Sequence, residues 1–319
     1  MAPSAVNEAQ STVVSAAKSA GKAKEEIMTA LRAISQGEVM PDIPTFPSFA
    51  AERRHILVHM AATFRNWSRN SYSEGQAGHI SVRDPEFPGV MWMNAMGRHY
   101  GMLRAGDMVA IDVATGAIVA GRPNPTTGRV TSNAAGYYIH SAVHRRRPDI
   151  HAVCHCHTAG GRAWSVFARP LDMLTQDVCN FYGAHAVYKK YGGIVFAADE
   201  ANNIAEALGE TNKALILMNH GLLTVGSTVD EAAYMFGLLE RSCAIQLQVE
   251  AALAGNSELK KHIISDEEAA HAFKMASETN ALYREFQPEI ELEIEAAGGE
   301  EVLAKGLEEL VINMDVPIA

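Results

Sequence analysis

The spacing of apolar residues changes along the chain and predicts short strands and helices in its middle part. A helix is predicted beyond residue 49, because apolar side chains recur there at the spacing of helical turns: Ile56, Leu57, Met60 and Phe64. Glycines at 75 and 78 interrupt this pattern. Short apolar runs then predict strands at residues 80–82, 90–93, 109–113 and 117–119, and Thr115-Gly116 predicts a hairpin turn between the last two.

Helices and strands continue to alternate in the second half. A helix is predicted at 132–146, closed by Pro148 because proline cannot continue a helix. The remaining segments are strands at 151–157, 194–196 and 214–218, a helix or turn at 160–168, and a helix at 199–208. Thr228-x-x-Glu231 predicts a capping box that opens a long helix reaching about residue 254. The alternation indicates the α/β class.

Three regions differ in composition. Residues 1–48 predict a helical arm that ends in a proline-punctuated link, and residues 49–255 form the α/β domain. Residues 256–319 predict a helical extension whose acidic side chains are expected to be solvated: Glu289, Glu291, Glu293, Glu295, Glu300 and Glu301.

Charge and cysteine content exclude several function classes. Among 319 residues, 37 acidic and 27 basic side chains give a net charge of −10, whereas binding to nucleic acid or to an anionic membrane needs a basic surface. Four cysteines are too few for a disulfide framework, and Cys154 and Cys156 are expected to pack within a strand. Without an apolar leader or an Arg-rich presequence, a cytoplasmic location is expected. No glycine-rich nucleotide loop follows a strand.

Three of the thirteen histidines stand where they can share a metal ion. His155-x-His157 lies on a predicted strand, and residues two apart on a strand point to the same face. His220 follows the strand at 214–218, and Gly221 is expected to allow a sharp turn that directs its imidazole back over the sheet. Three neutral imidazoles that leave an open position are typical of catalytic sites for zinc, with manganese, iron or cobalt as alternatives. The competing interpretation is a pair of structural histidines.

Residues 49–255 resemble the class II aldolase/adducin family. The resemblance follows four segments in order: Gly78–Asp84, Arg147–Ile150, Val153–Thr158 and Asn219–Gly226. It implies a three-layer α/β fold with a central, mostly antiparallel sheet flanked by helices. It also implies that His155, His157 and His220 bind a divalent metal, and that the chain assembles as a homotetramer with the metal site near a subunit boundary.

The sequence departs from the sugar-phosphate aldolases of this family at the residues that carry their chemistry. Their catalytic glutamate, in a Ser-Ser-Glu motif, falls on Gly136, and the two serines fall on Ala134 and Ala135. The other phosphate-binding pairs correspond to Gly78-His79 and Met96-Gly97. Because the side chains that would surround a phosphate are missing, we expect an unphosphorylated substrate.

Other polar residues are candidates to replace the missing groups. His79 and His185 are candidates for proton transfer, because imidazole titrates near neutral pH. Arg98 can hold a carboxylate in two parallel hydrogen bonds, and His99 adjoins it. Asp177 and Tyr182 follow the predicted strand that carries His155 and His157, and they are candidates to contact substrate. For each of these residues, a purely structural role is the alternative.

The sequence therefore predicts a metal-dependent lyase that cleaves an aldol bond or removes carbon dioxide from a small carboxylated or carbonyl substrate. Both reactions generate an enolate-like anion, which a divalent ion can stabilise. Two alternatives remain: an iron-dependent oxygenase on the same fold, and a non-catalytic assembly module like the adducin head domains. Retention of all three predicted ligands argues against the module, whereas loss of the glutamate argues for it.

Overall fold

The computed structural model of the chain describes residues 35–37, 41–193, 198–315 and 318. Most of the predicted N-terminal arm and the strand expected at 194–196 lie outside these residues. None of the helices in the described ranges combines the length and apolarity that a membrane span requires.

The centre of the molecule is one eight-stranded sheet with the order β4-β3-β2-β1-β5-β8-β7-β6. Within the described residues, its neighbouring strands pair antiparallel except for the parallel pair β6 and β7. Its strands are β1 (His79–Arg83), β2 (Val90–Asn94), β3 (Met108–Asp112), β4 (Ile118–Ala120), β5 (Ala152–Cys156), β6 (His185–Tyr188), β7 (Ala214–Leu217) and β8 (Gly221–Gly226). The mostly antiparallel sheet is confirmed, whereas β6 and β8 were not predicted from the sequence.

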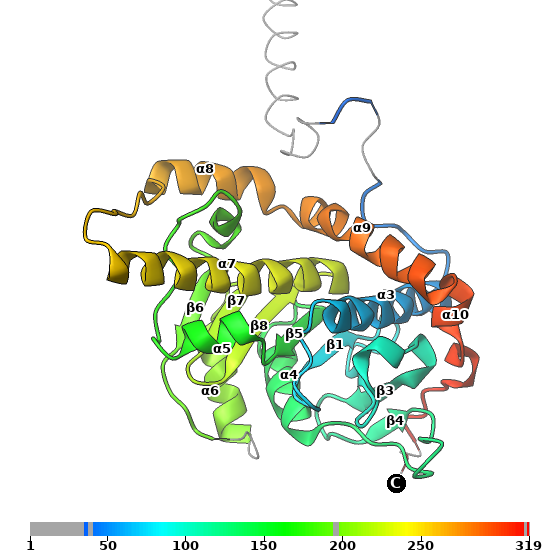
Figure 1. Cartoon of the computed structure of the whole chain (residues 1–319). Helices are drawn as coiled ribbons and strands as arrows, with labels where there is room; N and C mark the ends of the chain where they lie inside the picture. Colours follow the sequence, from blue (N-terminus) through cyan, green and yellow to red (C-terminus); the bar gives the residue numbers. More distant parts are fainter. Residues whose placement is uncertain (1–34, 38–40, 194–197, 316–317, 319) are drawn as a thin grey trace, which may run out of the picture.

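Helices cover both faces of the sheet and make three layers (Figure 1). α3 (Phe49–Arg69) and α7 (Val229–Gly255) lie over one face, and α4 (Ala134–Arg146) and α6 (Ala198–Leu208) lie over the other. Alternate residues of β5 serve the two sides: Cys154 and Cys156 join the core beneath α3 and α7, while Val153 joins the core beneath α4 and α6. This alternation confirms that both cysteines pack within the strand, and it directs His155 toward the α4 side.

The C-terminal extension packs on the domain. It comprises α8 (Asp266–Ala276), α9 (Thr279–Ala297) and α10 (Glu300–Ala304), and α9 lies against α3 and α7. Leu282 and Phe286 of α9 are buried in the same core as α3. Glu293 is 3% exposed and accepts hydrogen bonds from Arg69. The expectation of a solvated acidic face is therefore wrong for Glu293, because the chain folds back and supplies its partner.

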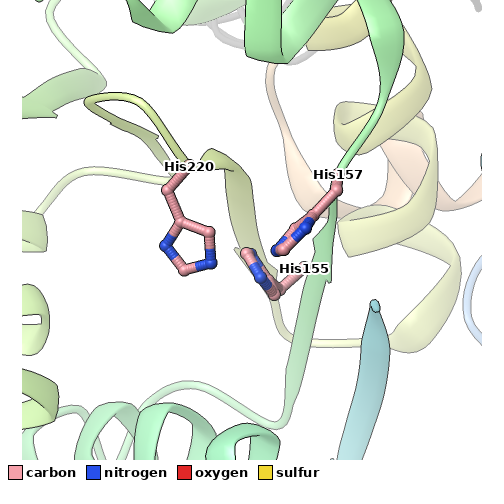
Figure 2. A group of neighbouring side chains, drawn as sticks. All are labelled: His155, His157 and His220. Carbon is pink, nitrogen blue, oxygen red and sulfur yellow. The ribbon is translucent and has the colours of Figure 1, made fainter. Parts of the chain in front are cut away.

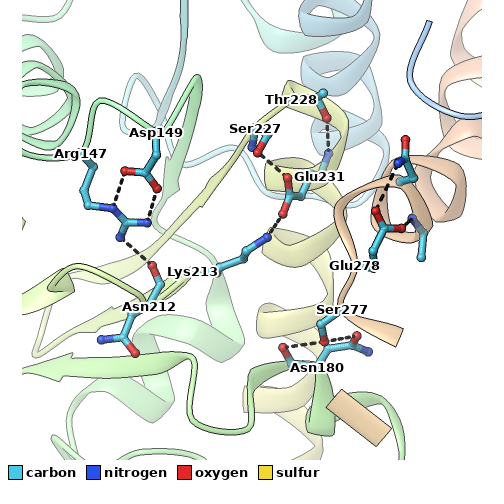
Figure 3. Close-up of polar contacts among 12 residues, drawn as sticks. Arg147, Asp149, Asn180, Asn212, Lys213, Ser227, Thr228, Glu231, Ser277 and Glu278 are labelled. Carbon is cyan, nitrogen blue, oxygen red and sulfur yellow. Dashed lines mark hydrogen bonds and ion pairs between the residues drawn. The ribbon is translucent and has the colours of Figure 1, made fainter. Parts of the chain in front are cut away.

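Two ion pairs fix the connections around the central strands (Figure 3). Arg147 ends α4 and donates two hydrogen bonds to Asp149 (2.9 and 2.8 Å) and one to the Asn212 carbonyl, which ties the start of β5 to the start of β7. Thr228 caps α7 by accepting from the Glu231 backbone N–H, but the Glu231 carboxylate pairs with Lys213 and the Ser227 N–H. The predicted capping box is thus half formed, because Glu231 is used to bind β7 to α7.

Candidate metal centre

Three imidazoles converge at one end of the sheet (Figure 2). His155 lies on β5, His157 follows that strand directly, and His220 lies in the turn between β7 and β8. One possible ligand atom from each lies within 4.8 Å of the other two. The ring centroids are 4.7 to 5.1 Å apart. A small shift brings such donors to the bond lengths of about 2.1 Å that zinc makes with histidine.

The turn that carries His220 is set by its neighbours. Asn219 adopts a left-handed conformation (φ 58°), which asparagine tolerates better than most residues, and the His220 N–H donates to the Leu217 carbonyl at 3.0 Å. Gly221 is required for a different reason from the one expected: a Cβ there would lie 2.7 Å from the Cys156 carbonyl oxygen. The missing side chain lets β8 approach β5 closely beside His157.

The protonation of His155 suits a metal ligand. Its Nδ1 lies 2.9 Å from the Leu222 carbonyl oxygen, which can only accept, so the proton resides on Nδ1 and the lone pair on Nε2. That Nε2 is buried and has no hydrogen-bond partner. Burial, followed by the nearby charges of His220 and His79, lowers the pKa of His155 well below its ordinary value. Burial also lowers the pKa of His220 to about 4. Neutral imidazoles with an unused buried nitrogen fit a divalent transition metal.

His79 stands beside this centre as the cross-strand partner of His155. The two rings stack with centroids 5.3 Å apart. On its other side the His79 ring lies against Gly136 of α4, where a Cβ would come within 2.7 Å of the His79 Cγ and Cδ2 atoms. The space beside residue 136 is therefore filled by the imidazole of His79. Burial lowers the pKa of His79 well below its ordinary value, and the charge of His140 adds to this effect.

A cavity of about 460 Å³ opens onto the three histidines and His79. Its other polar lining residues are Gln76, Asn133, Arg162, Tyr191 and Asn219. No carboxylate is among the described lining residues. Arg162 belongs to α5 (Ala159–Ser165), the helix that follows β5. Its guanidinium forms an ion pair with Glu74 at 2.7 Å. Sequence reasoning missed Arg162, although its position five residues after His157 on the next helix was a usable signal.

Two candidate substrate contacts lie elsewhere. Arg98 forms an ion pair with Asp107 at 3.0 Å and lines a separate cavity. His99 begins the 3-10 helix η1 (Tyr100–Met102) and accepts a hydrogen bond from the Gly101 N–H. Neither residue lines the cavity at the histidines in this chain.

Three further candidates lie outside the lining of the cavity. Both ring nitrogens of His185 are occupied: Nδ1 donates to the Phe181 carbonyl, and Nε2 accepts from the Leu171 N–H. His185 therefore has no nitrogen left for proton transfer, and the structure does not support the expected catalytic role. Asp177 opens the 3-10 helix η3 (Asp177–Phe181), and Tyr182 ends it. Neither lines the cavity, because η3 packs against α7 and α8 instead.

A second group of possible metal ligands has another use. His55, His59 and Asp230 bring donor atoms within 4.8 Å of one another. Asp230 is buried, and one of its oxygens accepts from the His59 Nδ1 at 2.6 Å and from the Gln287 amide at 3.0 Å. These hydrogen bonds join α3, α7 and α9, so the group has a structural explanation.

Comparisons with known proteins agree with this architecture. The family model described as "Class II Aldolase and Adducin N-terminal domain" matches residues 58–247, and the chain belongs to this family. The solved L-fuculose 1-phosphate aldolase from Glaciozyma antarctica is 34% identical, with a TM-score of 0.73 over 82% of this chain and 97% of that one. Decarboxylase NovR of Streptomyces niveus is 39% identical over 66% of this chain and 75% of its own length.

One more relative carries the name of an oxygenase. A protein of Streptomyces roseochromogenus, named 4-hydroxy-3-prenylphenylpyruvate oxygenase/4-hydroxy-3-prenylbenzoate synthase, is 40% identical over 66% of this chain and 73% of its own length. Class II aldolases typically depend on a divalent metal, bind small molecules and are often oligomeric. The family and its decarboxylase-named relative support an enzyme.

Replacing His157 with alanine should remove the metal. Protein purified without chelators should carry about one divalent ion per chain, and His157→Ala should carry less than about a tenth of that, because two imidazoles bind far more weakly than three. Elemental analysis measures both values. His262→Ala, which changes an exposed histidine outside the cavity, is the matched control and should keep its metal. Full occupancy in His157→Ala would show that the ligand assignment is wrong.

Proposed function

We propose that this chain is a divalent-metal-dependent lyase that acts on a small, unphosphorylated compound bearing a carboxylate and a carbonyl group. One observation carries the proposal: His79 fills the space beside residue 136, the position at which the sugar-phosphate aldolases have their glutamate. The cavity thus combines three candidate metal ligands with a neutral imidazole and lacks a carboxylate among its described lining residues.

The lining residues argue against a phosphorylated substrate. Ala135 lines the cavity where the family has a phosphate-binding serine, and its methyl group cannot donate a hydrogen bond. Met96, which stands for another phosphate-binding residue of the family, lines a different cavity. A solved structure similar to this chain is named as an L-fuculose 1-phosphate aldolase. Sugar phosphates are therefore the comparison substrates in any test of this proposal.

Arg162 is the residue best placed to bind a substrate carboxylate. It lines the cavity, and its ion pair with Glu74 joins two side chains that are 45% and 53% exposed. An exposed ion pair contributes only about 0–1 kcal/mol, so a substrate carboxylate can replace Glu74 at little cost. The N-terminus of α4, marked by Asn133, faces the same cavity and favours negative charge.

Decarboxylation suits this site better than aldol cleavage. Aldol cleavage starts when a base removes a hydroxyl proton, whereas loss of carbon dioxide needs no base at the start. A divalent ion at the three histidines would supply Lewis-acid stabilisation of negative charge on a substrate oxygen. The neutral His79 can donate a hydrogen bond to the same developing charge, and Arg162 can orient the carboxylate. A cavity without a carboxylate base fits this division of roles.

A panel of substrates tests the proposal. Metal-loaded protein should release carbon dioxide from unphosphorylated oxo acids, and His157→Ala should lose this activity. Fuculose 1-phosphate and ribulose phosphates should not be cleaved, because Ala135 and Met96 cannot donate the hydrogen bonds that the family's phosphate-binding side chains provide. Product analysis by mass spectrometry measures both reactions. Efficient cleavage of a sugar phosphate would overturn the proposal.

An iron-dependent oxygenase is the second candidate, favoured by the oxygenase-named relative. Oxygen consumption that accompanies carbon dioxide release, and occurs with iron but not with zinc, would select it. Protein that carries no metal and turns over no substrate would instead favour the non-catalytic assembly module.

Adding a side chain at position 136 should harm the site. Gly136→Glu should lower turnover of the native substrate at least about tenfold, because the new Cβ displaces His79 and an unpartnered buried carboxylate costs on the order of several kcal/mol. Gly136→Ala should show a smaller loss from the steric effect alone. Gly89→Ala, whose new Cβ meets nothing within 4 Å, is the matched control for steady-state kinetics. A gain of turnover in Gly136→Glu on both the native substrate and short aldol substrates would identify a degenerate sugar aldolase instead.

A further inference from the structure

A second cavity, of about 290 Å³, has a strongly basic lining. Five cationic side chains line it, together with a single carboxylate, that of Asp107: Arg98, Arg104, Arg122, Arg129 and Lys305. It shares no lining residue with the cavity at the histidines. Because the chain as a whole carries a net charge of −10, this local excess of positive charge is not a consequence of overall composition.

Internal pairing does not neutralise these cations. Arg98 pairs with Asp107 at 3.0 Å, and Arg122 pairs with Glu309 at 2.8 Å. Arg104 Nε is buried without a hydrogen-bond partner. Within the described part of the chain, the side chains of Arg129 and Lys305 have no ion-pair partner. Among the described residues, Arg104, Arg129 and Lys305 therefore form no ion pair, although Glu301 and Glu308 line an adjoining cavity with Arg104 and Lys305.

The fold holds these side chains around one space. Arg98 and Arg104 flank the short helix η1, and Arg122 and Arg129 both lie in the loop between β4 and α4. Lys305 comes from the C-terminal extension, whose next residue, Gly306, packs against Gly106 and under Arg122. A Cβ on Gly306 would overlap the Arg122 guanidinium, and Gly306 also has a positive φ of 85°. Close backbone contact thus brings Lys305 to the arginines.

Burial of the Arg104 Nε without a partner makes a bound anion favourable. Arg104 also lowers the pKa of neighbouring Arg65 by repulsion, which adds to the larger effect of burial on that guanidinium. A guanidinium removed from water without a counter-charge is costly, and a bound oxyanion would offset this cost. Arginine presents paired N–H groups that match phosphate oxygens. The hydroxyl of Thr131 and the amide of Asn124 are additional polar groups of the lining.

We propose that this cavity binds a small phosphate-bearing anion, at a site separate from the metal centre. A volume of about 290 Å³ accommodates a small phosphorylated molecule, and three unpaired cations match the charge of a diphosphate or a bisphosphate. The inference is independent of the proposed function, because the metal ligands take no part in it.

Titration calorimetry with pyrophosphate tests the site. The background is the full chain carrying His157→Ala, prepared metal-free, so that pyrophosphate cannot bind through a metal ion. We expect one saturable site per chain whose affinity falls as salt rises. Arg129→Gln with Lys305→Gln should weaken binding at least about tenfold, which corresponds to about 1.4 kcal/mol. Both side chains are exposed, so this double variant should fold normally.

Two further variants make the result decisive. Arg104→Gln should weaken binding to a similar or greater extent, because this guanidinium is the more buried one. Arg146→Gln removes an exposed charge at the end of α4, outside both cavities, and should leave the affinity unchanged. Absence of saturable binding, equal affinity in the Arg129/Lys305 double variant, or equal weakening by Arg146→Gln would overturn the proposal. The last result would mean that pyrophosphate responds only to overall charge.

Discussion

The position of β5 between β1 and β8 is the constraint on which the candidate metal centre depends. Its antiparallel register sets His155 directly opposite His79 on one side and opposite Leu223 on the other. Because side chains alternate across a strand, His155 and His157 share the face beneath α4, and a shift of one residue would turn both into the opposite core. Gly221 lets β8 come close enough to bring His220 to them.

The space between α4 and the three histidines can hold either the His79 ring or a side chain at position 136, and this choice determines the polar group beside the candidate metal ligands. His79 and any side chain at position 136 would occupy the same space, so the imidazole beside the candidate metal ligands and the glycine in α4 depend on each other. The exchange also changes the charge of the site, since a carboxylate would be negative near neutral pH whereas burial keeps His79 neutral. With His79 in place of a carboxylate, the positive charge of Arg162 is opposed by Glu74, and this balance supports our proposal of a carboxylated substrate.

Local patterns predicted most elements and the three converging histidines, because periodicity and the His-x-His spacing act over a few residues. They failed where the outcome depends on long-range packing. β8 was not predicted as a strand, and His185 is enclosed by backbone groups from two separate segments. Arg98 directly follows Met96-Gly97, the pair that corresponds to phosphate-binding residues of the family. In the structure it forms an ion pair with Asp107 and lines another cavity. Arg162 could have been found, because α5 follows β5 directly in the chain, but its direction into the cavity is set by the packing of that helix.

Anomalous diffraction from crystals of the metal-loaded protein tests the central claim most directly. At the absorption edge of the loaded metal, we expect one strong peak per chain within about 2.0–2.3 Å of a nitrogen from each of His155, His157 and His220, with His79 outside the coordination sphere. A peak at His55, His59 and Asp230 instead, or coordination by His79 in place of one of the three histidines, would contradict it.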